Sequence, residues 1–504
     1  MGKIDQLLSR LIQLVLIALF IFTPLAFSAV ELWAYSSMEL GILLLIVLGA
    51  FKMLSVGSSS RYASSPAAGF LQVSRSLLRR IWTSFEGRIF LLFLSFLLLI
   101  LLQAWTLPAA LSRFLSPKAF ELRRLLFPPN TPLTLPLDRF PISYFPLATR
   151  VEFYKWAALG GLFFFLLYWA RTDEGKRTQW RILPLVVFAM GAFESLYGII
   201  EFFSGHRHIL TMKAEAWVSS VTGTFLNRNN FAGYLLMVIP LSIGLFYSRQ
   251  VFPASRRASW RHYLASLDGK AIALAFGIVV MILALLFSAS RMGISSLLLS
   301  FGLITLIFRN PLKKEHIAWK SFFVLLFALV WATGIGLAPV IGRFFQSSDD
   351  LEWRWKFWVD TFRILLDYPI LGTGLGTFAW VSPMYRSFPV AGWASHAEND
   401  LLQLATEVGL VGIALLAVLS FLSLKKAAVT IRALPFESRE RYIAIGGLIG
   451  MLALLFHSLV EKNIQVPANG FLFTFLLAMV CGMSRLQRKE GAAGENTIRN
   501  RGIE

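Results

Sequence analysis

The chain has 504 residues, of which 56% are hydrophobic and only 15% are charged, and its formal net charge is +20. Soluble domains carry about 25% charged residues, so this composition excludes an ordinary soluble globular protein. The cations lie between apolar blocks and form no single patch with interleaved aromatic residues, which argues against nucleic-acid binding. The single cysteine, Cys481, excludes an internal disulfide and a cysteine metal cluster.

Apolar blocks long enough to cross a bilayer recur along the whole sequence. A hydrocarbon core of about 30 Å requires about 20 helical residues, whereas a β-barrel would show short alternating segments. We therefore predict an all-α polytopic membrane protein with about twelve transmembrane helices. The predicted spans are residues 11–30, 38–54, 89–107, 151–170, 182–203, 226–247, 271–289, 292–308, 321–340, 405–424, 442–460 and 467–484.

The distribution of Lys and Arg indicates which ends of these helices face the cytoplasm. Cytoplasmic loops carry an excess of Lys and Arg, and an even number of spans places both termini on one side. Residues 171–181, 249–270, 309–320 and 425–441 carry four or five cations each, whereas the short turns near Ser37, Arg291 and Lys462 carry at most one. The sequence thus predicts cytoplasmic termini and places these three turns outside.

Two outside segments are longer than ordinary connections, which favours a functional role for them. Residues 108–150 are rich in proline, and we expect them to be mostly irregular. Residues 341–404 contain apolar side chains at helical spacing over Leu351–Leu366, which predicts an amphipathic helix on the outer membrane surface, ended before Pro369. We divide the chain into an N-terminal part (1–188), a membrane core (189–485) and a basic cytoplasmic tail (486–504).

Arginines stand at the outer mouths of two predicted spans. Arg228 lies among Asn227, Asn229 and Thr224 at the start of a helix, where free amides and the helix dipole suit an anion. Arg291 lies in the tight turn between two spans, and Arg354 lies on the amphipathic segment. Arginines that converge there would suit a diphosphate, because guanidinium groups bind phosphate oxygens bidentately. The alternative for each of them is snorkelling to lipid phosphates.

A polar cluster precedes the predicted span at 405–424. His396 is the best candidate base, because imidazole titrates nearest to neutral pH. Glu398, Asn399, Asp400 and Gln403 gather beside it at the entry of a membrane helix, where polar residues are costly and usually functional. A purely structural histidine is the alternative. His457 lies near the end of another span and is placed to line the same cavity.

The segment Gly372–Gly376 reads Gly-Thr-Gly-Leu-Gly and has only a superficial likeness to a phosphate loop. It lacks both the preceding strand and the following lysine of such loops. We predict that it is a flexible turn, which lets the outer segment fold back over the bundle.

At these residues the chain resembles the O-antigen ligase and O-antigen polymerase superfamily of bacterial envelope proteins. The resemblance is collinear from about Ala189 to Met483. It rests on residues 223–229, the Ser290-Arg291 turn, Arg354 with Trp358, and residues 369–378, 396–412, 457–463 and 467–469. Met292 departs from the family pattern, which often has glycine after the Ser-Arg pair.

The resemblance implies a glycosyltransferase of the bacterial inner membrane whose active site faces the periplasm. Its donor would be a glycan on undecaprenyl diphosphate, and its acceptor a sugar hydroxyl on lipid A core, for a ligase, or on another lipid-linked glycan, for a polymerase. Arg228 and Arg291, together with Arg354, would bind the diphosphate, and His396 would be the base, with Glu398 beside it. We expect an inverting transfer that is independent of metal ions and needs no cofactor.

The sequence leaves other functions open. It does not separate a ligase from a polymerase of O-antigen or exopolysaccharide, and transfer to a protein hydroxyl uses the same chemistry. From a different class, a lipid-linked glycan transporter or flippase would also place charged residues at the mouth of a helix bundle. Transporters more often place polar or interrupted helices near the midplane in two related halves, whereas the polar groups here gather at one face. We therefore favour transfer over transport.

Overall fold

The computed structural model describes residues 2–57, 82–126, 139–205, 208–213, 220–249, 268–307, 347–389, 395–436 and 438–483, and the statements below concern these residues. The first helices are α1 (Gly2–Leu25), η1 (Phe27–Ala29), α2 (Leu32–Gly57), α4 (Phe85–Ala104), α5 (Ala109–Leu115), α6 (Pro117–Leu126), α7 (Pro146–Trp169) and α8 (Asp173–Arg177). They are followed by η2 (Thr178–Ile182), α9 (Leu183–Ser204), α10 (Arg228–Tyr247), α12 (Gly269–Phe287) and α13 (Arg291–Ile307). The last are α16 (Ser347–Asp367), α17 (Phe378–Val381), η4 (Ser382–Tyr385), α18 (Asp400–Ala433), α19 (Arg439–His457) and α20 (Pro467–Gly482).

The helical membrane architecture is confirmed. Within the described ranges, nine helices are long and apolar enough to cross a membrane, and α13 and α20 are shorter apolar helices. Together they coincide with eleven of the predicted spans, while the span at 321–340 lies outside the described residues, as does the tail at 486–504. Helices prevail because each backbone amide must find its partner within the segment when lipid offers none.

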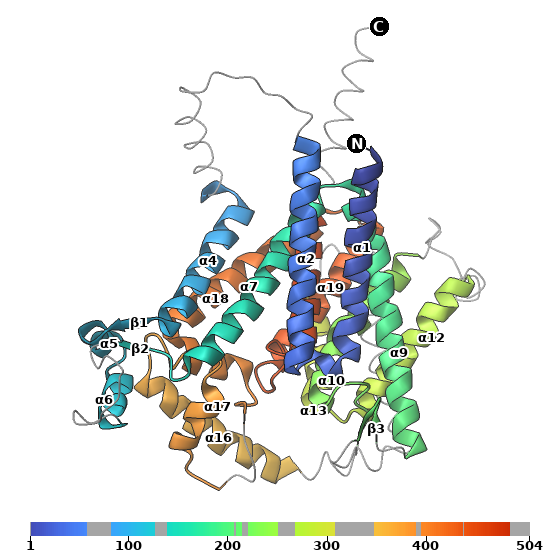
Figure 1. Ribbon diagram of the computed structural model, residues 1–504. Helices are drawn as coiled ribbons and strands as arrows, with labels where there is room; N and C mark the ends of the chain where they lie inside the picture. Colours follow the sequence, from blue (N-terminus) through green and yellow to red (C-terminus); the bar gives the residue numbers. More distant parts are fainter. Residues whose placement is uncertain are drawn as a thin grey trace, which may run out of the picture.

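Two helices form the centre of the bundle. In both α10 and α19, 78% of the apolar window is buried, against 22% in α4. Their backbones approach closely because Gly446 and Gly450 face α10, where an added Cβ would overlap the backbone of Pro240 and Met237. Small residues four apart are a common way to pack membrane helices closely. The pair therefore forms the closely packed centre of the bundle (Figure 1).

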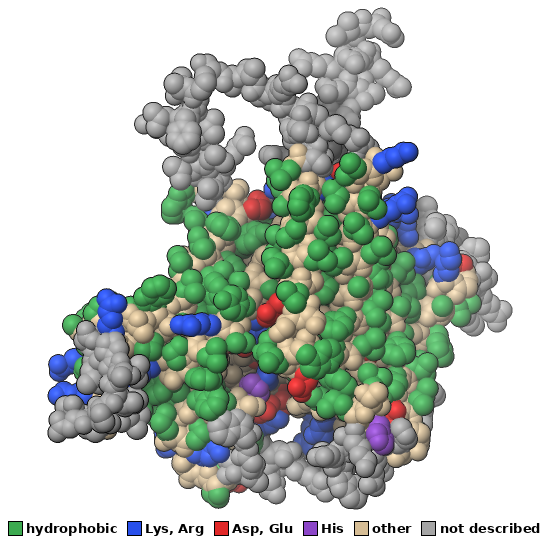
Figure 2. Space-filling view, in the orientation of Figure 1, with side chains coloured by type: hydrophobic (Ala, Val, Ile, Leu, Met, Phe, Trp, Pro, Cys, Tyr) green, Lys and Arg blue, Asp and Glu red, His purple; other side chains and the backbone are tan. Residues whose placement is uncertain are grey.

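The segments outside the helix bundle gather at one of its ends. Figure 1 shows α5, α6, α16, α17 and β3 at the lower end, whereas α1 begins at the upper end. Strands β1 (Thr106–Pro108) and β2 (Arg139–Pro141) pair antiparallel with Leu107 opposite Phe140, and β3 (His208–Ile209) pairs with β4 (Met212–Lys213). Figure 2 shows apolar side chains over the upper bundle and a hollow at the lower end, where acidic, basic and histidine side chains meet.

The proline-rich segment is more regular than expected. It contains α5 and α6, joined through the β1–β2 pair to the start of α7, whereas residues 127–138 lie outside the described residues. Three of its prolines stand at helix starts: Pro108 precedes α5, Pro117 begins α6 and Pro146 begins α7. Proline suits a first helical turn because its missing N–H would find no partner there. The prediction of a mostly irregular segment was therefore wrong for the described part.

The predicted amphipathic helix is confirmed as α16, which ends two residues before Pro369. One of its faces packs on the protein through Phe357 and Ile364, which are almost fully buried. The opposite face exposes Trp355 and Leu366, as a helix on a membrane surface does. This helix crosses the lower end of the bundle and holds two parts of the site described next (Figure 1).

Candidate active site at the lower end of the bundle

A break in α18 shapes the floor of the site. Gly409 has a φ of 66° and a ψ of −176°, so α18 is interrupted after its first two turns. The carbonyls of Thr406 and Glu407 accept hydrogen bonds from the amides of Thr373 (2.9 Å) and Gly374 (3.0 Å). A helix break at membrane depth is tolerated only where such partners exist. The first segment of α18 is thereby held in place by a loop from a distant part of the chain.

The glycine-rich loop that supplies these partners is fixed and buried. Gly372, Gly374 and Gly376 all have positive φ angles, of 69°, 106° and 78°, which glycine adopts without strain. The buried Gln103 of α4 ties the loop to α18, since its Nε2 donates to the carbonyls of Leu371 (2.5 Å) and Glu407 (2.8 Å). The loop folds back over the bundle as predicted, but the expectation of flexibility was wrong.

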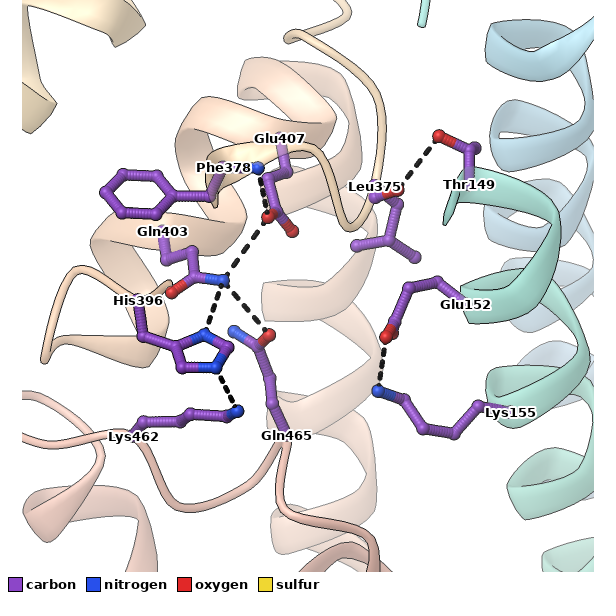
Figure 3. Close-up of polar contacts among 10 residues, drawn as sticks. All are labelled: Thr149, Glu152, Lys155, Leu375, Phe378, His396, Gln403, Glu407, Lys462 and Gln465. Carbon is purple, nitrogen blue, oxygen red and sulfur yellow. Dashed lines mark hydrogen bonds and ion pairs between the residues drawn. The ribbon is translucent and has the colours of Figure 1, made fainter. Parts of the chain in front are cut away.

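His396 lies directly before α18, in contact with two polar side chains (Figure 3). Its Nε2 contacts the Nζ of Lys462, and its Nδ1 is 3.5 Å from the Nε2 of Gln403. The Nε1 of Trp358, on α16, donates to the carbonyl of Ala397 (3.1 Å) and so anchors the histidine loop. Burial, assisted by the charge of Lys462, lowers the pKa of His396. The imidazole is therefore neutral near pH 7.

Gln403 connects His396 to the rest of the site. Its Nε2 also reaches the Oε1 of Glu407 (3.3 Å) and the Oε1 of Gln465 (3.4 Å), while its Oε1 accepts from the amide of Ala397 (3.1 Å). Figure 3 shows these side chains converging from α18 and from the segment before α20. The Oε2 of Glu407 and the Nε2 of Gln465 are buried without a partner among the described residues. The Nε2 of Gln465 is therefore available to a bound molecule, whereas the backbone N–H of Gly376 also interacts with the Glu407 carboxyl group.

The turn at residues 458–466, between α19 and α20, is held against α18 by Asp400. One oxygen of this carboxylate accepts from the amides of Asn463 and Ile464, both at 2.7 Å, and the amide of Asp400 donates to the carbonyl of Ser458 (2.9 Å). These bonds place Lys462 beside His396. Burial lowers the pKa of Lys462 to about 8. The sequence predictions placed Asp400 in the polar cluster before this span but gave neither Asp400 nor Lys462 a role.

Arg354 and Glu398 both meet the same turn. Arg354 donates to the carbonyl of Val460 (2.6 Å) and to the Oε1 of Glu461 (2.5 Å). Burial raises the pKa of Glu461, and Glu398 lies near enough for its carboxylate to raise that pKa further. The Arg354 guanidinium is thus engaged by the turn in this state.

A buried polar chain links the other predicted residues to this turn. The Nδ1 of His457 lies 3.1 Å from the Nδ2 of Asn463, and its Nε2 lies 3.4 Å from the hydroxyl of Ser290. Asn469 continues the chain, because its Nδ2 lies 3.4 Å from the Oδ1 of Asn463 and 3.0 Å from the backbone carbonyl of Asn230. This chain brings the turn before α13 and the start of α10 to the same end of the bundle as His396.

Arg228 and Arg291 begin α10 and α13, and both are partly buried. Ser290 and Asn230, which the buried polar chain contacts, are their near neighbours in sequence. Asn227 and Asn399 act as helix N-caps, since their side chains accept from the amides of Asn229 (2.7 Å) and Leu402 (2.9 Å). These two asparagines therefore fix the starts of α10 and α18.

An ion pair on α7 faces the same space and was not predicted. The Nζ of Lys155 lies 2.6 Å from the Oε1 of Glu152, and both side chains are mostly buried. Figure 3 shows the pair on the side opposite His396 and Lys462. Charges spaced three residues apart in a predicted span were a usable signal, because intramembrane charges are costly. They escaped notice because the family resemblance begins only at Ala189.

The described ranges contain no group of three or more His, Cys, Asp or Glu side chains that could hold a metal ion. What the site offers is one neutral imidazole, several cations and buried carboxyl groups, gathered at one end of a membrane bundle. Such a set can take a proton from a hydroxyl and stabilise an anionic leaving group.

Comparison with protein families agrees with this chemistry. Residues 276–417 match the family described as O-antigen ligase. The matched segment includes Arg291, Arg354 and His396, whereas Arg228, Lys462 and the α7 pair lie outside it. No curated protein matches the chain. The match to the O-antigen ligase family at residues 276–417, in a multi-pass membrane protein, thus confirms the resemblance to the O-antigen ligase and polymerase superfamily and supports a membrane glycosyltransferase of that type.

Proposed function

We propose that the chain transfers a glycan from undecaprenyl diphosphate to a sugar hydroxyl at the end of the bundle that holds His396. The observation that carries the proposal is the position of His396. This residue belongs to the segment that matches the O-antigen ligase family, and it contacts Lys462 and Gln403 within a cluster of polar side chains. The polymerase alternative uses the same donor and differs only in the acceptor.

In the proposed reaction the acceptor hydroxyl gives its proton to His396. The acceptor oxygen forms a bond to the anomeric carbon as the bond from that carbon to the diphosphate oxygen breaks. The electron pair stays on undecaprenyl diphosphate, and a single displacement of this kind inverts the anomeric centre. Arg228 and Arg291 would stabilise the charge that develops on the diphosphate, since positioned cations are most effective where charge appears.

Lys462 gives this reaction a way to couple donor binding to the base. In the structure the Nζ of Lys462 contacts the Nε2 of His396. An arriving diphosphate attracts the ammonium group of Lys462 away from His396. Once the ammonium group has left, Nε2 of His396 is free to accept the proton of the acceptor hydroxyl. Arg354 would give up its hydrogen bond to Glu461 and bind phosphate oxygens of the diphosphate instead. Glu461 would then keep its proton. Glu398, near Glu461, would support that exchange.

The proposed setting is the bacterial inner membrane, with cytoplasmic termini and the site facing the periplasm. The cation-rich connections at residues 171–181 and 425–441 support this orientation. Cysteines introduced singly near Glu174 and near Met384, in a background without Cys481, would report it through labelling of intact cells. Labelling of the Met384 site alone is expected, and the reverse pattern would overturn the orientation.

The decisive test is transfer by the purified protein in liposomes that contain undecaprenyl diphosphate glycan. Lipid A core and a lipid-linked glycan serve as alternative acceptors, and the identity of the product separates a ligase from a polymerase. We expect His396→Ala to reduce the rate by about 10²–10⁴-fold, the usual contribution of a positioned base. His208→Ala, in β3 and outside the site, is the matched histidine control. Full activity of His396→Ala would refute the base assignment.

A further inference from the structure

A carboxyl group stands deep inside the bundle, apart from the residues discussed so far. Glu194 lies on α9, ten positions before the end of this helix at Ser204, which at about 1.5 Å per residue is about 15 Å. Its side chain is fully buried. Among the described residues, no Lys, Arg or His forms an ion pair with it. An unpaired carboxylate at this depth is very costly, and ionisable residues inside membrane helices are usually functional.

Glu194 holds the turn that leads into α10. Its Oε2 accepts a hydrogen bond from the backbone amide of Thr224 (2.8 Å), and the hydroxyl of Thr224 lies 2.8 Å and 2.9 Å from its two carboxyl oxygens. The backbone of this turn is not helical. Irregular backbone at membrane depth persists only where the protein supplies hydrogen-bond partners, and Glu194 supplies one.

The hydrogen bonds of Thr224 indicate that Glu194 carries a proton. The Thr224 hydroxyl also lies 2.9 Å from the backbone carbonyl of Pro24, in the last turn of α1. A hydroxyl has only one hydrogen to donate. If that hydrogen goes to Pro24, a protonated Oε1 of Glu194 can donate to the hydroxyl oxygen. The neutral acid thus satisfies all of these contacts, whereas a carboxylate would leave oxygen atoms facing each other without a hydrogen between them.

The turn has no room to move against α9. An added Cβ at Gly198, one helical turn after Glu194, would lie 2.7 Å from the backbone nitrogen of Gly223. Gly223 has a φ of 58°, and an added Cβ there would lie 2.6 Å from the Oε2 of Glu194. Phe225 is fully buried, and its ring centroid lies 5.8 Å from that of Phe231 on α10. These contacts fix the place where α10 begins.

Arg228 is the first residue of α10, four positions after Thr224. Its guanidinium can bind a diphosphate well only while the start of α10 keeps its place, because bidentate hydrogen bonds to phosphate depend on precise geometry. The support for Arg228 therefore comes from α1 and α9, which lie beside each other (Figure 1).

We propose that Glu194 is a positioning residue for Arg228, and that it acts through Thr224 as a neutral carboxylic acid. The proposal rests on the transfer function above, in which Arg228 binds the diphosphate of the donor. It gives a role to α1 and α9, which lie outside the segment that matches the O-antigen ligase family.

Binding of undecaprenyl diphosphate without a glycan, measured in nanodiscs of zwitterionic lipid, tests this role independently of catalysis. We expect Glu194→Ala to weaken binding at least about tenfold, equivalent to about 1.4 kcal/mol. Glu194→Gln should bind within about twofold of the wild type, because its amide N–H can replace the proton of the acid. Glu201→Ala, on the same helix, is the matched control, since Glu201 accepts from the hydroxyl of Tyr197 (3.2 Å) and not from the turn.

Thr224 offers a second pair of variants in case Glu194→Ala folds poorly. Thr224→Val keeps the shape of the side chain but loses the hydroxyl, and should weaken binding as Glu194→Ala does. Thr224→Ser keeps the hydroxyl and should bind like the wild type. In the transfer assay, Thr224→Val should raise the KM of the donor and leave the KM of the acceptor unchanged. A general loss of folded protein would change neither KM.

A double-mutant cycle tests whether Glu194 acts through Arg228. In an Arg228→Gln background, where Arg291 remains to bind the diphosphate, Glu194→Ala should weaken binding by no more than about twofold. A further loss of about tenfold would show that Glu194 acts elsewhere, and would overturn the proposal.

Infrared spectroscopy tests the proton on Glu194 without substrate. The difference spectrum between the wild type and Glu194→Gln at about pH 7 should contain the carbonyl stretch of one protonated carboxylic acid. A carboxylate band in its place, or binding by Glu194→Gln as weak as that of Glu194→Ala, would refute the neutral acid.

Equal binding by Glu194→Ala, Thr224→Val and the wild type would overturn the positioning role even if transfer occurs. If the wild type and the variants bind undecaprenyl diphosphate in the expected pattern but the wild type performs no transfer, the positioning role stands and the proposed reaction fails.

Discussion

The two sides of the bundle are built in opposite ways. Around α10 and α19 the helices touch through glycines, and their residues are mostly buried. Around α7 and α18 the helices stand apart along an apolar groove, and α18 is interrupted at Gly409. The closely packed side carries Arg228 at the start of α10, and the open side carries Lys155. Close packing fixes the position of a charge, whereas an open side leaves room for a substrate.

The largest effect is expected from breaking the closely packed side. Gly446→Leu places a side chain against the backbone of Pro240, where the helices cannot separate without losing their common interface. Overpacking of this kind costs about 1–3 kcal/mol, and occasionally more. We expect little folded protein by size-exclusion chromatography and thermal unfolding in detergent. Gly302→Leu, where an added Cβ meets nothing within 4 Å, is the control. Equal stability of the two variants would contradict the close approach of α10 and α19.

A smaller loss is expected where the glycine loop meets the break in α18. Gly372 has a φ of 69°, and an added Cβ would overlap the backbone of Glu407. Gly205 has the same φ but nothing within 4 Å of an added Cβ. A side chain in this backbone region costs about 1–3 kcal/mol of strain, so Gly372→Val and Gly205→Val should both lose stability. The difference between their losses measures the contact of Gly372 with α18. Thermal unfolding should show a larger loss for Gly372→Val, and equal losses would exclude a tight contact.

The smallest expected effect concerns pH. Lys462 has a pKa of about 8 in the folded protein, below the ordinary lysine value of 10.5, so the unfolded chain binds more protons between these values. Stability should therefore rise with pH across that window. Lys462→Gln removes this rise, and it also removes a cation that lowers the pKa of His396. The fall of the transfer rate at acid pH should then begin at a higher pH, because the pKa of His396 is higher without Lys462.

The control for this pH effect is Lys176→Gln, because Lys176 pairs with Asp173 on the short helix α8, apart from the site. Its pH profile should match that of the wild type. An unchanged acid limb in Lys462→Gln would show that Lys462 does not govern the protonation of His396.

The site could be predicted only in part. His396, Gln403 and His457 were found because polar side chains at the ends of apolar segments stand out in sequence. Asn227 and Asn399 were found for the same reason, but their role as helix caps depends on backbone geometry. Lys155 stayed unrecognised because it lies 241 positions from His396, and no local pattern joins α7 to α18. Only the folded bundle brings them to one space (Figure 3).

The sequence by itself determined the helices and the amphipathic segment, and indicated the end of the bundle where function resides. Each of these follows from local composition, because a chain in lipid must satisfy its own backbone and cations avoid the outer side. The tertiary structure alone decided that α18 breaks at Gly409, that the glycine-rich loop is fixed, and that a groove adjoins His396. Those features depend on how distant side chains and backbones pack, which no local pattern of residues specifies.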